Sequence, residues 1–181
     1  MLRLFKTHQI YPVVPLVVVA IAMWVLSWGS HFNVLETNGM PLYDLVFRVL
    51  APGGLRAYAI VGFLLFVSQA IHLNFIVNKH EILYKDTWLP DLSHLIIGSI
   101  FPQFLWFHPI LLVNSVILFA IDKIFSLYKN PSALALAFDS SFLLGLAILF
   151  YAPAVSLFIF FALCILLLRP FSWRDWFVGI P

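Results

Sequence analysis

The segment Leu55–Asn78 has the sequence LRAYAIVGFLLFVSQAIHLNFIVN and is followed directly by Lys79. Its only charged residue is Arg56, at the start. A helix of about 20 apolar residues crosses the hydrocarbon core of a bilayer, which is about 30 Å thick. The segment therefore predicts a transmembrane helix, and five further apolar segments resemble it: Ile10–Trp28, Leu89–Trp106, Pro109–Leu127, Ala133–Tyr151 and Pro153–Leu168. Together they predict an all-α polytopic membrane protein, with about six transmembrane helices in a single domain over residues 1–181.

The composition supports a membrane protein and excludes several classes of function. Hydrophobic residues make up 63% of the chain and charged residues 10%, whereas about a quarter of the residues in a soluble domain are charged. The few basic residues form no continuous stripe, so we expect no nucleic-acid partner. Cys164 is the single cysteine and allows no disulfide within the chain. The sequence predicts no cofactor and no metal site.

Basic residues predict the topology through the positive-inside rule. If the N-terminus is cytoplasmic, only Arg48 and Arg56 of the ten Lys and Arg residues fall in outer segments. The others fall in inner segments: Arg3, Lys6, Lys79, Lys85, Lys123, Lys129, Arg169 and Arg174. We therefore expect six spans with both termini cytoplasmic, in a bacterial inner membrane. Short spans leave an alternative, in which the third and fourth segments, or the fifth and sixth, form a re-entrant hairpin turned by prolines.

The outer segment Gly29–Gly54 contains a predicted interfacial helix over residues 41–51. Pro41 is a favourable first residue, and Pro52-Gly53-Gly54 would end the helix. One face is apolar, because the apolar residues recur at helical spacing: Leu42, Leu45, Val46, Val49 and Leu50. In one interpretation this helix only anchors the loop. In the other, four charged side chains line a site for a lipid-linked substrate: Glu36, Asp44, Arg48 and Arg56.

Five polar residues fall inside the apolar segments and form a predicted intramembrane cluster: His72, Asn74, Asp91, His94 and Asp139. Asp91 and His94 are three residues apart and share a helical face. Ionisable groups within spans are costly, so they usually face a partner inside the bundle. Three roles stay open at this point: structural hydrogen bonding, binding of a lipid headgroup or a partner, and proton or ion transfer.

Two stretches resemble parts of the GT-C superfamily of membrane glycosyltransferases. The first is Pro41-Leu42-Tyr43 after an acidic outer loop, and the second is Phe142-Leu143-Leu144-Gly145-Leu146-Ala147 with Tyr151-Ala152-Pro153. The resemblance implies sugar transfer from a polyprenyl-phosphate lipid. Glu36 and Asp44 would then be the catalytic candidates, and Arg48 and Arg56 would hold the lipid phosphate. The chain departs from the superfamily in Gly29–Leu35, where an expected Asp is absent.

Over nearly its whole length the chain also resembles an uncharacterised family of Bacteroidota inner-membrane proteins. The matching stretches are His80-Glu81-Ile82-Leu83-Tyr84-Lys85-Asp86-Thr87-Trp88-Leu89-Pro90, Leu127-Tyr128-Lys129 and Arg169-Pro170-Phe171-Ser172-Trp173-Arg174-Asp175-Trp176. Members of that family continue further, so the resemblance implies that this chain corresponds to their N-terminal part.

The expected function is that of a non-catalytic structural or accessory subunit of a cell-envelope assembly. Its partners would be membrane lipids and other membrane subunits. A GT-C-like transferase, with a polyprenyl-phosphate lipid as ligand, and a lipid or ion transporter are the alternatives.

Overall fold

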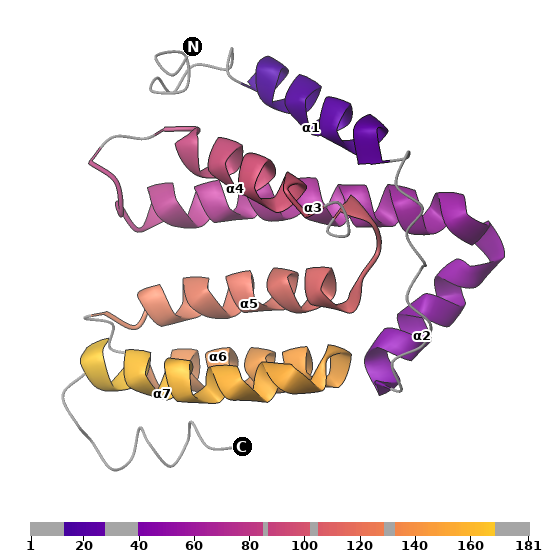
Figure 1. Ribbon diagram of the computed structural model, residues 1–181. Helices are drawn as coiled ribbons and strands as arrows, with labels where there is room; N and C mark the ends of the chain where they lie inside the picture. Colours follow the sequence, from indigo (N-terminus) through magenta and orange to yellow (C-terminus); the bar gives the residue numbers. More distant parts are fainter. Residues whose placement is uncertain (1–12, 28–39, 85–86, 102–104, 129–132, 169–181) are drawn as a thin grey trace. The chain divides into compact units, whose positions relative to one another are not determined.

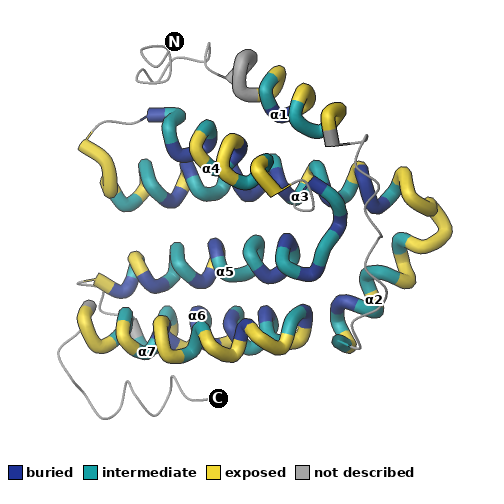
Figure 2. Tube along the Cα trace, viewed as in Figure 1, coloured by how far each residue is buried: buried dark blue, intermediate teal, exposed yellow. Residues whose placement is uncertain are grey.

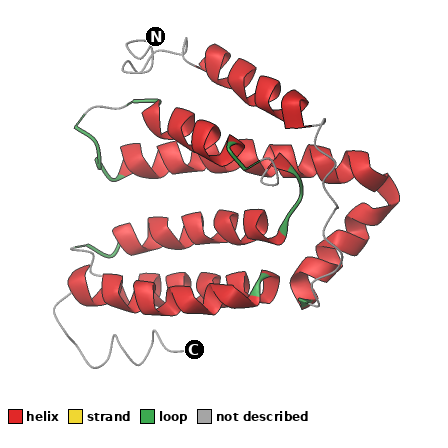
Figure 3. Ribbon diagram, in the orientation of Figure 1, coloured by secondary structure: helices red, strands yellow, loops and turns green. Residues whose placement is uncertain are grey.

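The structure is a computed structural model that describes residues 13–27, 40–84, 87–101, 105–128 and 133–168. All regular elements within these residues are helical, as Figure 3 shows. This confirms the all-α class for the described part of the chain. The elements are α1 (Val13–Ser27), α2 (Pro41–Leu50), the 3₁₀ turn η2 (Ala51–Gly53), α3 (Gly54–Lys79), α4 (Leu89–Ser99), α5 (Pro109–Phe125), α6 (Ala133–Phe150), η4 (Ala152–Ser156) and α7 (Leu157–Leu168).

Each of the six predicted apolar segments contains a helix, but only one helical run within the described residues is long and apolar enough to cross a membrane. This run extends over Pro41–Lys79 and includes α3. The helices over Val17–Leu26, Leu134–Phe150 and Ala152–Leu167 are apolar but shorter. Length and composition alone support this assignment, so the six-span organisation stays a prediction.

Helix α4 is shorter than the segment predicted for it. It has 11 residues and ends at Ser99, so it is about 16 Å long at 1.5 Å per residue. The prediction extended to Trp106. Pro102 explains the early end, because a proline has no amide N–H and disfavours the helical conformation in the residue before it. A helix of this length does not by itself cross about 30 Å of hydrocarbon, so a full crossing and a re-entrant hairpin both stay predictions for this segment.

The chain divides into two compact units, and the first contains α1, α3 and α4. Helices α3 and α4 form an antiparallel hairpin, and α1 packs against α4 (Figure 1). Figure 2 shows buried positions recurring along α3 and α4 among half-buried and exposed ones. Six buried residues form the core of this unit: Ala20, Phe66, Ala70, Leu95, Leu105 and Leu111.

Two glycines allow the close packing in the first unit. At Gly98 of α4, an added Cβ would collide with the ring of Phe66 in α3. At Gly62 of α3, it would collide with the backbone of Trp106 and Phe107. Small residues commonly permit such close approach between membrane helices.

The second unit contains α6, α7 and most of α5. Its core joins all three helices through Ala120, Ile124, Leu127, Ala137, Leu144 and Phe161. Helices α6 and α7 are connected by η4, which has a proline in its first turn. This proline is Pro153, at the start of the sixth apolar segment. The core of this unit is therefore built from one face of each helix.

The predicted helix over residues 41–51 corresponds to α2. It ends at Leu50, and the chain passes through η2 into α3 at Gly54, whose φ of 59° is in the left-handed region. The Tyr58 hydroxyl donates a hydrogen bond to the Phe47 carbonyl oxygen at 3.0 Å, and the two rings stack at 4.9 Å. This bond satisfies one of the carbonyls that a helix end leaves without an intrahelical partner.

Part of the apolar face predicted for α2 is not covered by the rest of the chain that the structure describes. Leu45 and Val49 are exposed, whereas Tyr43 is buried. An exposed apolar face fits contact with lipid, but the location of α2 at a membrane surface stays a prediction.

Candidate functional site

Asp91 is the most unusual polar residue in the first unit. Helix α4 begins at Leu89, whose amide donates to Thr87 Oγ1 at 3.4 Å, and Asp91 lies in the first turn. An acidic side chain is favourable there because of the helix dipole. The Asp91 residue is 0% exposed, and neither carboxyl oxygen has a hydrogen-bond partner among the residues that the structure describes. A buried carboxylate without donors costs several kcal/mol.

His94 lies one turn further along the same face of α4, as predicted. Its ring packs against the Phe66 ring with centroids 5.1 Å apart. The Nε2 atom is buried and also has no partner within the described part of the chain. A carboxyl group and an imidazole thus share one buried helix face. Both groups can bind a proton or a cation.

Helix α3, which pairs with α4 in the hairpin, contains two more of the predicted polar residues. Gly98 contacts Phe66, and the helices are antiparallel, so Asp91 lies about level with residues 73 and 74 of α3. Asn74 is buried, and its Oδ1 accepts a hydrogen bond from Asn78 Nδ2 at 3.3 Å. His72 is half-buried with its ring 6.4 Å from that of Phe75. Four of the five residues in the predicted cluster therefore belong to the α3–α4 hairpin.

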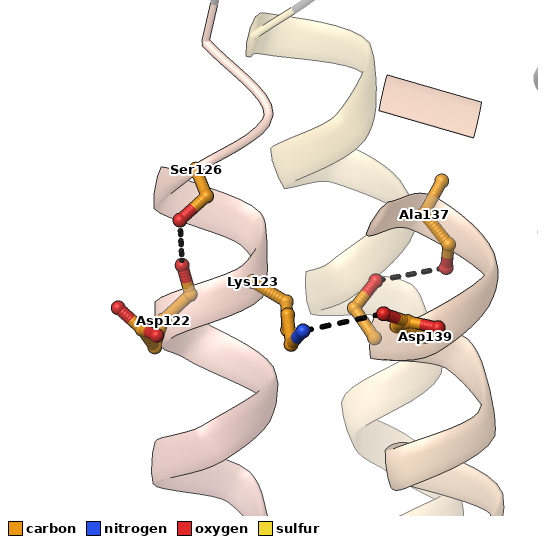
Figure 4. Close-up of polar contacts among 6 residues, drawn as sticks. Asp122, Lys123, Ser126, Ala137 and Asp139 are labelled. Carbon is orange, nitrogen blue, oxygen red and sulfur yellow. Dashed lines mark hydrogen bonds and ion pairs between the residues drawn. The ribbon is translucent and has the colours of Figure 1, made fainter. Parts of the chain in front are cut away.

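Asp139, the fifth residue, has a partner that was not predicted. It belongs to the second unit, where its Oδ2 pairs with Lys123 Nζ of α5 at 3.2 Å (Figure 4). The expected partners were His72, Asn74 and the Asp91–His94 pair, and proximity to them stays a prediction. The sequence contained a signal for the observed pair, because Lys123 lies in the last turn before the α5–α6 connection and Asp139 lies in the second turn after it.

The predicted outer site is only partly described. Glu36 lies outside the described residues. Asp44 of α2 is half-buried, and its Oδ1 has no hydrogen-bond partner among the described residues. Arg48 and Arg56 are exposed. Convergence of these four side chains on one substrate stays a prediction.

Gln69 is a structural contact that sequence reasoning missed. It is 2% exposed, and its Nε2 donates to the Leu111 carbonyl oxygen in the first turn of α5 at 2.6 Å. Together with Tyr58 it holds helices together within the first unit. A glutamine in the middle of an apolar segment was the signal, because a buried amide needs partners.

His108 begins α5. Its Nδ1 accepts the amide N–H of Ile110 at 3.2 Å, which is the geometry of an N-cap. Burial lowers the pKa of His108 below its ordinary value of 6.5. Neutral His108 can accept this hydrogen bond, whereas protonation at Nδ1 would remove the acceptor and place a positive charge at a helix N-terminus.

Comparison with known protein families, with curated proteins and with solved structures finds no match to this chain. Within the described residues, no three His, Cys, Asp or Glu side chains come together as metal ligands. Asp91 and His94 are the residues whose chemistry defines the candidate site.

Proposed function

We propose that this chain is a multi-pass protein of a bacterial inner membrane and acts as a non-catalytic structural or accessory subunit of a cell-envelope assembly. The observation that carries the proposal is the character of the exposed side chains. Each of α1, α3, α4, α6 and α7 exposes large apolar residues, among them Leu26 at 74%, Ile159 at 70% and Leu167 at 83%. Soluble monomers rarely expose apolar patches larger than a few hundred Å², so a bilayer or another membrane chain would cover these surfaces.

The polar contacts within the units support a structural role. Gln69 donates to a carbonyl of α5, Tyr58 donates to a carbonyl of α2, and Asn78 donates to Asn74 within α3. The first two bonds connect different helices, and the third connects two side chains of one helix. Polar groups used in this way contribute roughly 1 kcal/mol each to the packing of membrane helices.

Two experiments test the proposal. Cys164→Ser gives a cysteine-free background, into which single cysteines can be placed at Tyr84, which is 98% exposed, and at Asn38, Asn130 and Ser172. An impermeant thiol reagent should label only the cysteine at position 38 from the outer face. Labelling at position 84 from outside would contradict the six-span topology.

The second experiment addresses the subunit role. The full chain, carrying an affinity tag, is crosslinked in native membranes and copurified, and its crosslinked peptides are identified by mass spectrometry. The proposal expects a defined membrane partner at stoichiometric yield, crosslinked to an exposed apolar helix face. Recovery of the protein alone, in a homogeneous form without any crosslinked chain, would contradict it.

Asp91 and His94 favour one alternative function, which is proton or ion transfer. Ionisable groups buried inside a membrane bundle are usually kept for such a purpose or for a partner. Proteoliposomes with a pH-sensitive dye in the lumen distinguish the two. Transfer predicts a proton or cation flux that Asp91→Asn abolishes, whereas a structural subunit predicts no flux in either protein.

A further inference from the structure

Lys123 and Asp139 form an ion pair whose side chains are both partly exposed on the surface of the second unit. Their charged atoms are 3.2 Å apart, and their side chains are 40% and 46% exposed. Figure 4 shows them pointing toward each other from α5 and α6, with Asp122 on another side of α5. Both residues lie close to helix ends, Lys123 in the last turn of α5 and Asp139 in the second turn of α6. The pair therefore presents one positive and one negative charge together at one end of the second unit.

Exposed aromatic side chains lie near this pair in the sequence of α6. Phe138 and Phe142 of α6 are both more than half exposed, and their rings stack at 6.4 Å. Phe142 lies one turn beyond Asp139, toward the apolar middle of α6. Phe138 lies level with Asp139, so the two stacked rings run from the level of the charges toward the apolar middle of α6, which is the order of a headgroup and its acyl chains across a membrane interface.

We propose that Lys123 and Asp139, with Phe138 and Phe142, form a binding site for a zwitterionic aminophospholipid such as phosphatidylethanolamine. This inference rests on the proposed membrane location. The lipid phosphate would contact the Lys123 ammonium, and the primary ammonium of the lipid would donate to the Asp139 carboxylate. The acyl chains would lie along the two phenylalanine rings.

Charge complementarity selects this lipid class. Anionic phosphatidylglycerol can satisfy Lys123, but it has no cation for Asp139 and its phosphate is repelled by that carboxylate. Phosphatidylcholine has the same net charge as phosphatidylethanolamine, but its quaternary ammonium has no N–H to donate. Charge-assisted hydrogen bonds are about twice as strong as neutral ones, so the primary amine should decide the preference.

The test is native mass spectrometry of the full chain in detergent, titrated separately with the three lipids. Wild type should bind phosphatidylethanolamine about fivefold more tightly than phosphatidylglycerol, the ratio expected for an exposed ionic contact of roughly 1 kcal/mol. Asp139→Asn should remove this preference. Lys123→Arg, which conserves the charge, should keep it. Lys79→Gln is the matched control, since Lys79 is an exposed lysine over a phenylalanine ring in α3, and it should also keep it.

The proposal is overturned if wild type binds phosphatidylglycerol as tightly as phosphatidylethanolamine, or if Asp139→Asn keeps the preference. Should Asp139→Asn yield no folded protein, Lys123→Gln serves instead and should weaken binding of both lipids; unchanged binding would overturn the proposal. Membrane insertion is measured separately by alkaline carbonate extraction. An extracted protein contradicts the proposed membrane location, whereas an inserted protein without lipid preference contradicts only this site.

Discussion

Substituting alanine at three helical glycines tests the packing of the first unit. Gly62 and Gly98 lie in close contacts, whereas an added Cβ at Gly145 of α6 meets nothing within 4 Å. In an open site, Gly→Ala stabilises a helix by up to about 1 kcal/mol, because alanine has the higher helix propensity. Overpacking a well-filled contact costs about 1–3 kcal/mol. The sign of the effect should therefore differ between these glycines.

The structure also ranks the two close contacts. The Cβ added at Gly62 would collide with backbone atoms of Trp106 and Phe107, which have no side-chain rotation to relieve the clash. At Gly98 the obstacle is the Phe66 ring, which is 2% exposed and can shift only slightly. After subtracting the propensity gain, we expect Gly62→Ala to destabilise by about 1–2 kcal/mol and Gly98→Ala by somewhat less. Gly145→Ala should be neutral or stabilising.

Thermal unfolding of detergent-purified protein measures this order. Tryptophan fluorescence is suitable, since Trp24 and Trp106 pack against the core of the first unit, and size-exclusion chromatography after heating gives an independent midpoint. The double variant Phe66→Leu/Gly98→Ala should cost less than the sum of its single substitutions, because the smaller leucine vacates the contact. A midpoint for Gly62→Ala at or above that of Gly145→Ala would refute the close packing described here.

Three further predictions concern charged and titratable residues. Asp91→Leu should raise the free energy of unfolding by about 1–4 kcal/mol, since it removes a buried carboxyl without donors; a loss of stability in chemical denaturation would reveal a partner outside the described residues. The contribution of His108 to the free energy of unfolding should decrease as pH falls below about 6.5, because its pKa is lowered in the folded protein and the unfolded chain then binds the proton more readily. The melting midpoint of wild type should therefore fall relative to that of His108→Asn as pH decreases from 7 to 5, since asparagine caps the Ile110 amide without titrating. Glu36→Gln and Asp44→Asn should leave copurification of partners unchanged; loss of a sugar-transfer activity at normal protein levels would favour the GT-C-like alternative.

Much of the helical organisation was predictable from local sequence. The predicted segments contain helices with bounds within a few residues of those expected at Leu55–Asn78, Pro109–Leu127 and Ala133–Tyr151. Prolines and glycines determine where helices end, because their effect on φ and on the amide N–H acts within one turn. The exception is α4, where the apolar pattern continues to Trp106 but the helix ends before Pro102.

The candidate site was predictable as a set of residue types but not as a set of contacts. The shared face of Asp91 and His94 follows from helical spacing alone. By contrast, the Lys123–Asp139 pair and the bond from Gln69 to the Leu111 carbonyl join residues of different helices. Which residues meet across a helix pair depends on how side chains of both surfaces interlock along their length.

Sequence alone thus determined the helical class, the apolar character of each helix and the positions of its polar residues. These properties depend on each residue and its neighbours within a turn or two. The tertiary structure decided that Gly98 meets Phe66, that Asp139 meets Lys123 and that Asp91 is enclosed without a described donor. Such contacts depend on the register between helices, and a shift of one residue along a helix turns its side chains by about 100°.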